Sequence, residues 1–260
     1  MTLSGNTLYG TTAWGGSSGW GTVFALNTDG TSFTTLYTFT GGSDGGWPRR
    51  APLILSGNTL YGTTYEGGSG RGSSGKGTVF AVNTNGTGFT VLHSFFGSSD
   101  GANPFAGLTL SGNTLYGMAN LGGSRGMGTL FAVNTDGTGF TNLYNFTGGR
   151  DGANPYGGLI LSSNTLYGTT YSGGTGGNGT VFSLSFRPRL TINPSQTNLI
   201  LTWPTNYAGF DYTGYTLQST TNLGSSAVWA TNSPAPVVVN GQNVMTNSIT
   251  GTQQFYRLIQ

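Results

Sequence analysis

The chain lacks cysteine altogether and is poor in charge. Without cysteine, neither a disulfide bond nor a thiolate metal site is possible. Charged residues form 6% of the 260 residues, against about 25% in ordinary globular chains. The nine lysine and arginine residues leave a formal net charge of +2 and form no basic tract. Nucleic acid is therefore not expected as a partner.

Acid–base groups are equally scarce. His93 is the only histidine and Glu66 the only glutamate. A serine–histidine–aspartate triad needs a histidine beside its nucleophile, and a glycosidase needs two cooperating carboxylates. We therefore expect no enzyme, no catalytic residue, no cofactor and no metal site.

Long apolar runs are also missing, so no transmembrane helix is predicted. Met1 to Ser4 lead directly into a repeated pattern, and we expect no signal peptide within this chain. Threonine, serine and asparagine fill the polar positions, which is more usual for secreted β-proteins or packed fibres. We expect the protein to be extracellular or displayed on the cell surface.

Glycine is abundant, with 48 residues, and it occurs within a tandem repeat. The phrase Asn-Thr-Leu-Tyr-Gly occurs four times, and Gly-Thr-(Val/Leu)-Phe follows each copy. The tyrosines of the first phrase, Tyr9, Tyr61, Tyr116 and Tyr167, are separated by 52, 55 and 51 residues. Two insertions in glycine-rich stretches explain the longer intervals. A period near 50 predicts propeller blades or a similar array.

Each repeat is predicted to contain four short strands. In the second repeat they span about 52–55, 58–65, 78–83 and 89–95, with Asn85-Gly86 in the third turn. Gly62 lies inside the second strand, and it indicates either a β-bulge or a close approach of backbone near a propeller axis. Four sequential antiparallel strands make a propeller blade. The fold class is therefore all-β, with a four-repeat propeller-like domain.

We place that domain at residues 1–186. Its repeats span about 1–51, 52–106, 107–157 and 158–186, and the fourth lacks its last strand. Residues 187–260 form a second domain. Alternating apolar residues, an Asn240-Gly241 turn and one early tryptophan, Trp203, predict a small immunoglobulin-like or fibronectin-III-like sandwich there.

The ordered motifs Asn-x-Leu-Tyr-Gly-Thr-Thr, Gly-Thr-Val-Phe, Leu-Tyr-x-Phe and Asp-Gly-Ala-Asn-Pro carry a family resemblance. With them, residues 1–186 resemble the bacterial choice-of-anchor tandem-repeat GloVer proteins. The tail, with Leu-Thr-Trp-Pro at 201–204 and Phe-Tyr-Arg-Leu at 255–258, is similar to C-terminal domains of exported Verrucomicrobia-type proteins. The resemblance implies secretion or surface display and no particular biochemical activity.

Asp44, Asp100 and Asp151 occupy one position of the repeat. They could form a ring of carboxylates for calcium or for acid–base chemistry. The following glycine favours instead an Asx turn between one repeat and the next. His93 occupies a position held by tyrosine in other repeats, so we predict a packing or surface role for it.

The long loop between the second and third strands varies most among the repeats. Its aromatic residues could stack on sugars or fill a partner's pocket, or they could cover neighbouring blades. The candidates for recognition are Trp14, Trp20, Tyr65 and Tyr171. Candidate glycosylation sites in Asn-x-Ser/Thr sequons are Asn85, Asn145 and Asn178.

The leading functional hypothesis is a non-enzymatic, structural protein that assembles with itself. The strand missing from the fourth repeat could be supplied by the segment after Phe186 or by a neighbouring subunit, through β-augmentation. Head-to-tail donation would then build a filament or a surface layer. The alternative is a carbohydrate-binding surface adhesin. A third hypothesis, a propeller enzyme acting on glycans, would depend on the three aspartates.

Overall fold

The computed structural model describes residues 1–49, 51–69, 75–207, 209–249 and 253–260. These residues form strands and no helix, so the all-β prediction is confirmed. The chain divides into two compact units, Met1–Leu184 and Ser185–Gln260. Each unit is described by itself below.

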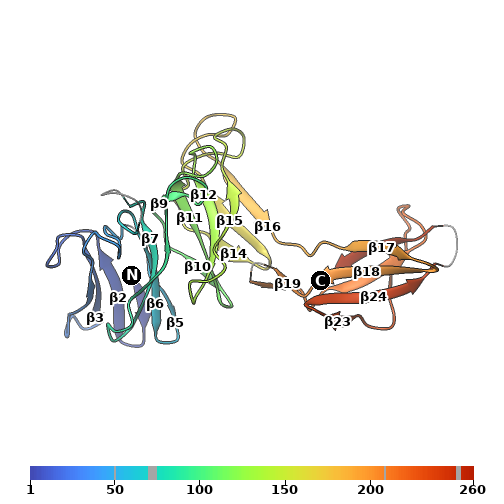
Figure 1. The fold of residues 1–260 in the computed structure, drawn as a ribbon, viewed down its shortest axis with the longest axis horizontal. Helices are drawn as coiled ribbons and strands as arrows, with labels where there is room; N and C mark the ends of the chain where they lie inside the picture. Colours follow the sequence, from blue (N-terminus) through green and yellow to red (C-terminus); the bar gives the residue numbers. More distant parts are fainter. Residues whose placement is uncertain (50, 70–74, 208, 250–252) are drawn as a thin grey trace. The chain divides into compact units, whose positions relative to one another are not determined.

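The first unit contains four sheets, each an antiparallel meander of consecutive strands (Figure 1). The first sheet comprises β1 (Thr2–Ser4), β2 (Thr7–Thr12), β3 (Thr22–Asn27) and β4 (Thr34–Thr38). The second comprises β5 (Ile54–Ser56), β6 (Thr59–Thr64), β7 (Thr78–Asn83) and β8 (Thr90–Ser94). The third comprises β10 (Thr109–Ser111), β11 (Thr114–Leu121), β12 (Thr129–Asn134) and β13 (Thr141–Asn145), and β9 (Ala102–Pro104) also pairs with β11. The fourth has three strands, β14 (Ile160–Ser162), β15 (Thr165–Thr169) and β16 (Val181–Ser185).

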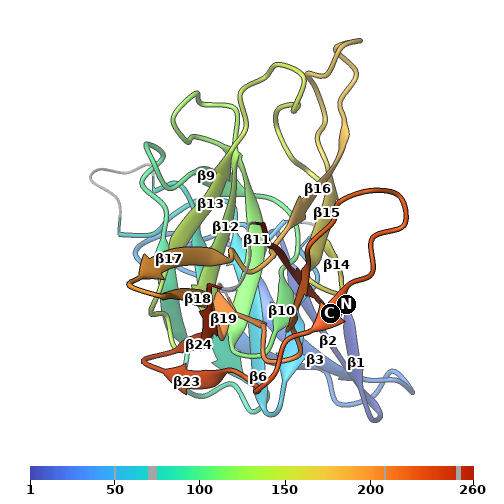
Figure 2. The same cartoon turned by 90° about the vertical axis from the view of Figure 1, so that its right-hand side faces the viewer.

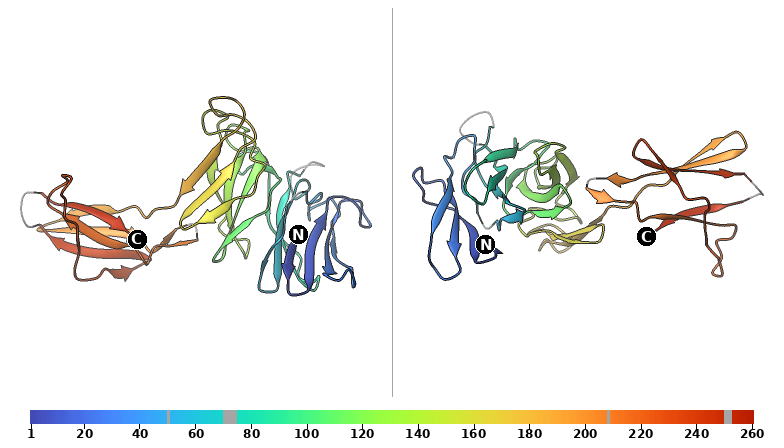
Figure 3. Two further views of the ribbon diagram at one scale, coloured as in Figure 1. Left: turned by 180° about the vertical axis from the view of Figure 1, so that it is seen from behind. Right: turned by 90° about the horizontal axis from the view of Figure 1, so that it is seen from below.

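The first three sheets pack face to face and share one apolar layer at each of their two junctions. Between the first two sheets, Val23 and Phe39 contact Leu60, Phe80 and Val82, and all five are fully buried. A similar layer joins the second sheet to the third. Burial of these aliphatic and aromatic side chains supplies the main favourable free energy of the unit. The same kind of interface thus recurs along the first three sheets. Figures 2 and 3 give further views of these strands.

The glycine inside each second strand makes room for a phenylalanine. Gly62 lies opposite Phe80 in the β6–β7 pair. A Cβ on Gly62 would lie 2.6 Å from Phe80 Cζ and 2.8 Å from Leu53 Cδ2. The register of β6 with β7 is continuous, and the irregularity falls between Val79 and Phe80 in the next pairing. The close approach is therefore real, but an aromatic ring makes it rather than backbone near an axis.

The third turn of each of the first three repeats is longer than a two-residue hairpin. Asp29 Oδ1 accepts hydrogen bonds from Thr31 N at 2.9 Å and Thr31 Oγ1 at 2.6 Å. Only the glycine of the Asp-Gly pair has positive φ, +82° at Gly30. The aspartate thus acts as a side-chain acceptor in an Asx turn, and the glycine provides the left-handed backbone.

In the second unit, two sheets share one core. One sheet has the order β17 (Thr191–Ser195), β18 (Asn198–Pro204), β24 (Gln242–Ser248), β23 (Val237–Val239), and the other β22 (Ala230–Thr231), β21 (Thr216–Thr220), β25 (Phe255–Ile259). A hairpin of β19 (Asn206–Tyr207) and β20 (Phe210–Asp211) stands apart from both. Leu201, Trp203 and Met245 of the first sheet pack against Leu217 of the second.

The Asn240-Gly241 turn predicted from the sequence is confirmed. It joins β23 to β24, with φ of +49° at Asn240 and +73° at Gly241. Strand β24 itself was not expected, because asparagine, glutamine, threonine and serine predominate in it. Its pairing on both sides, with β18 and β23, holds it in the sheet.

Candidate functional site

The repeated aspartates join each sheet to the next. Asp44 accepts hydrogen bonds from Thr40 N at 2.8 Å, Thr40 Oγ1 at 2.5 Å and Tyr37 Oη at 3.2 Å. Its backbone carbonyl accepts from Thr78 Oγ1 in the following sheet at 3.4 Å. Burial and then the Asp44 carboxylate raise the pKa of Tyr37 to about 12. A carboxylate saturated by local donors in this way acts as a turn residue.

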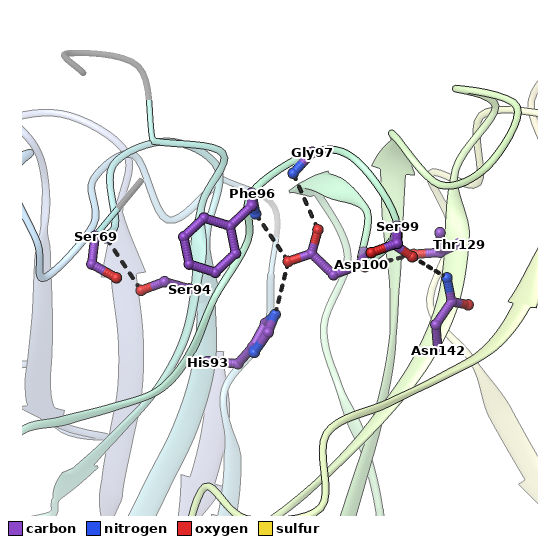
Figure 4. A network of polar contacts seen from close by, with 9 residues as sticks. All are labelled: Ser69, His93, Ser94, Phe96, Gly97, Ser99, Asp100, Thr129 and Asn142. Carbon is purple, nitrogen blue, oxygen red and sulfur yellow. Dashed lines mark hydrogen bonds and ion pairs between the residues drawn. The ribbon is translucent and has the colours of Figure 1, made fainter. Parts of the chain in front are cut away.

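Asp100 repeats this arrangement with histidine in place of tyrosine (Figure 4). Its carboxylate lies 3.2 Å from His93 Nε2 and accepts hydrogen bonds from the Phe96 and Gly97 amides. Thr129 Oγ1 of the next sheet donates to its carbonyl at 3.2 Å. Burial acts to raise the pKa of Asp100, but the hydrogen bonds outweigh it and the net shift is downward.

The three carboxylates are thus held apart, each in its own turn. Among the described residues, no group of three or more histidine, aspartate or glutamate side chains could hold a metal ion.

A stacked pair of rings lies at the junction between the first and second repeats and again between the second and third. Tyr37 stacks on Phe89 of the next repeat, with ring centroids 3.7 Å apart and planes 4° from parallel. His93 stacks on Phe140 in the same way, at 3.5 Å and 6°. His93 therefore fills a tyrosine position and packs between repeats.

The junction between the third and fourth repeats has no such stacked pair in the described residues. The fourth repeat contains no equivalent of Phe89 or Phe140, and Tyr144 is 39% exposed. A pocket of about 210 Å³ occupies this place, lined by Leu130, Tyr144, Phe146, Asp151, Phe182, Ser183 and Leu184. We call it the outer-strand pocket, because the segment leading into the fourth strand fills its equivalent in earlier repeats.

The face of the last sheet is open as well. Val181 occupies the repeat position of Val23, Val79 and Leu130; it is 82% exposed, whereas each of those three is 0% exposed. Tyr167 is 43% exposed, compared with 7% for Tyr61 and 0% for Tyr116. We call Ile160, Tyr167 and Val181 the end face.

A second feature is a row of aromatic side chains on the loops that connect the sheets. Tyr65, Phe105, Tyr156 and Tyr171 contact one another in succession, with centroid separations of 5.8, 4.9 and 5.3 Å. Each ring is nearly perpendicular to the next, at 82°, 89° and 82°. Edge-to-face pairs of this kind are favourable.

Arg49 continues the row toward the first repeat. Its guanidinium lies 4.6 Å from the Trp47 ring centroid, 5.3 Å from Tyr65 and 5.4 Å from Trp14. In the described part of the chain the one ion pair is His93–Asp100, so Arg49 has no carboxylate partner there. A depression of about 390 Å³ is lined by Ala13, Trp14, Arg49 and Phe105.

Trp47 adopts an unusual backbone conformation beside this arginine. Its φ is +54°, and the equivalent residues are Asn103 at +56° and Asn154 at +54°. Asparagine tolerates the left-handed region, but a bulky side chain there is strained by about 1–3 kcal/mol. The Trp47 ring packs against the rings of Trp14 and Trp20, with centroid separations of 4.8 and 5.1 Å. Strained residues of this type cluster at functional sites.

The four predicted recognition residues differ in their surroundings. Trp14 and Tyr171 are exposed, at 60% and 72%, and Tyr65 is half-buried in the row. Trp20 packs on the core layer of the first two sheets and against Gly41, so it is mainly structural.

Sequence reasoning missed Trp47, Arg49, Phe105 and Tyr156. The last three share a signal that was available, because each directly follows the proline of a repeat connection, Pro48, Pro104 or Pro155.

The sequon asparagines also differ in accessibility. Asn85 and Asn178 are exposed. Asn145 is half-buried in β13, and its Oδ1 accepts hydrogen bonds from Ser124 N and Asn142 Nδ2, both at 3.0 Å.

Comparison with known proteins gives a family but no activity. No curated protein matches the chain. Among solved structures, similarity is found to a chain of the nidogen/laminin complex, with 18% identity, a TM-score of 0.44, and coverage of 76% of this chain and 68% of that one. TolB from Acinetobacter baumannii is 11% identical, with a TM-score of 0.40 and coverage of 84% of this chain and 50% of the TolB chain. A puromycin-hydrolyzing peptidase of Mycobacterium tuberculosis is 14% identical, with a TM-score of 0.36 and coverage of 76% of this chain and 24% of the peptidase. The chain thus spans half of that TolB chain and about a quarter of that peptidase, and these likenesses transfer no function.

No helix in the described residues is long and apolar enough to cross a membrane. The profile of the Gloeobacter/Verrucomicrobia repeat matches residues 1–182 and again 69–223. The first match alone covers well over half of the chain and includes strands β1 to β15 of the first unit. The chain therefore belongs to the Gloeobacter/Verrucomicrobia repeat family.

Proposed function

We propose that this protein is a non-enzymatic, extracellular building block that assembles head to tail with copies of itself. The observation that carries the proposal is the exposure of Val181 at a position that is fully buried in every earlier repeat. The second unit, which we interpret as an immunoglobulin-like or fibronectin-III-like sandwich, follows directly after this open sheet.

The two ends of the sheet stack are complementary. Inside the unit, one face of a sheet packs against the opposite face of the next sheet. In the second sheet the first type of face carries Tyr61 and Val79, and in the third sheet the second type carries Leu115 and Phe131. The end face is a face of the first type, because Tyr167 and Val181 occupy the repeat positions of Tyr61 and Val79. The first sheet presents the second type, through Leu8, Phe24 and Leu26, with Phe33 beside Phe24 at 5.4 Å and 61% exposed. A neighbouring copy can therefore repeat the internal interface.

The outer-strand pocket supports strand addition at the same end. In the part of the chain that the structure describes, β16 pairs with β15 and with no second strand. A free strand edge with an adjacent apolar pocket is the arrangement that β-augmentation uses. A neighbour's strand that carries phenylalanine would complete the contact with Tyr144 and Phe146 that Phe89 makes with Tyr37 and Phe39.

An interface that joins unlike surfaces gives a closed ring or an open filament, depending on the rotation between copies. We expect the scattering mass of the purified chain to rise with concentration, and electron micrographs to show rings or filaments. A constant monomer mass across a wide concentration range would contradict the proposal.

A further inference from the structure

We propose that the aromatic row and Arg49 form a binding site for an acidic oligosaccharide, a sugar chain that carries carboxylates. The site is distinct from the end face and goes beyond the assembly function. It consists of Trp14, Trp47, Arg49, Tyr65, Phe105, Tyr156 and Tyr171.

The shape of the site suits an extended ligand. The four rings in mutual contact come from three repeats: Tyr65 and Phe105 from the second, Tyr156 from the third and Tyr171 from the fourth. A compact ligand would meet only one or two of these rings. A chain of sugar units can place successive apolar ring faces on successive aromatic side chains.

The exposure of the rings supports binding more than packing. Trp14 is 60% exposed, Tyr156 40% and Tyr171 72%, although each contacts another member of the site or lines its depression. Trp47, Tyr65 and Phe105, which lie between them, are half-buried, so the site has exposed rings at both ends. Exposed aromatic side chains that gather in this way mark an interaction site. The strained backbone of Trp47 places one more ring beside Arg49, where other repeats have asparagine.

The charge of the site selects the kind of sugar. Arg49 is half-buried among three aromatic rings and has no carboxylate partner in the described residues. The rings fix the guanidinium by cation–π contact, and its N–H donors match the geometry of a carboxylate. A neutral oligosaccharide would leave these donors without a charged acceptor, so an acidic one is favoured.

The test is titration of the full chain with an oligogalacturonate, and with a neutral cello-oligosaccharide of equal length. We expect the acidic oligomer to bind and the neutral one to bind at least about tenfold more weakly, the size of one charge-assisted hydrogen bond. Arg49→Gln should weaken binding of the acidic oligomer by about tenfold. Trp14→Ala should weaken both oligomers by about fivefold, since it removes one stacking ring and spares the core.

Arg257→Gln is the matched control, because Arg257 also lies over a tryptophan ring, 4.2 Å from the centroid of Trp229. It should leave binding unchanged. Three results would overturn the inference: no binding of the acidic oligomer, equal binding of both oligomers with no effect of Arg49→Gln, or an equal loss in the Arg257→Gln control. Self-assembly is measured separately, so failure of either proposal leaves the other standing.

Discussion

Replacement of Val181 by aspartate is expected to leave the chain folded but monomeric. Val181 is 82% exposed, so the carboxylate stays solvated in the free subunit. In the proposed assembly the same position is buried against the first sheet of a neighbour. Burial of an unpaired carboxylate costs several kcal/mol, so association should weaken by at least about a hundredfold. Analytical ultracentrifugation at several concentrations measures this effect.

The control for this substitution is Val228→Asp in the second unit, where the valine is equally exposed at 81%. It adds the same charge to the same chain without touching the end face. We expect its sedimentation to match that of the unmodified chain. Loss of assembly in both variants would mean that net charge, and not the end face, controls association.

Substitution of Gly62 by alanine should destabilise the first unit by about 1–3 kcal/mol, the usual cost of overpacking a core. The added methyl group would lie 2.6 Å from the Phe80 ring and 2.8 Å from Leu53, and both residues are buried. The ring cannot move away, because it also packs against Phe39 at 5.1 Å. Urea unfolding followed by near-ultraviolet circular dichroism measures the change.

Gly158→Ala provides the comparison, since a Cβ there has nothing within 4 Å and its φ is not positive. Its effect should stay within about 0.5 kcal/mol. If both substitutions were equally mild, close packing of the phenylalanine ring would not be the reason for glycine in the second strand.

The local structure of the repeats could be predicted from the sequence because it depends on short-range patterns. Alternating apolar residues and Asn-Gly or Asp-Gly pairs indicate strands and turns within a few residues. The predicted strand at 78–83 coincides with β7. Asp44 and Asp100 do lie in turns, as predicted, but their carboxylates accept from the amides of Thr40 and Phe96, four residues earlier, and not from two residues on as in an Asx turn.

The candidate sites depend on contacts that no short pattern encodes. Tyr65 and Phe105 are 40 positions apart and meet because successive sheets stack. Arg49 departs from its repeat position, which holds phenylalanine and tyrosine elsewhere, but the sequence does not show that it lies among three aromatic rings. The missing strand of the fourth repeat was visible in the sequence. The exposure of Val181 was not, because it depends on which sheet follows.

A mixing experiment tests head-to-tail assembly most directly. The Val181→Asp chain keeps an intact first sheet, and a Phe33→Asp chain keeps an intact end face. Each variant alone should sediment as a monomer, because each has lost one of the two unlike surfaces. Mixed in equal amounts, they should form a one-to-one dimer and nothing larger, since only one interface in the pair remains functional. Two monomers that stay separate after mixing would contradict the account.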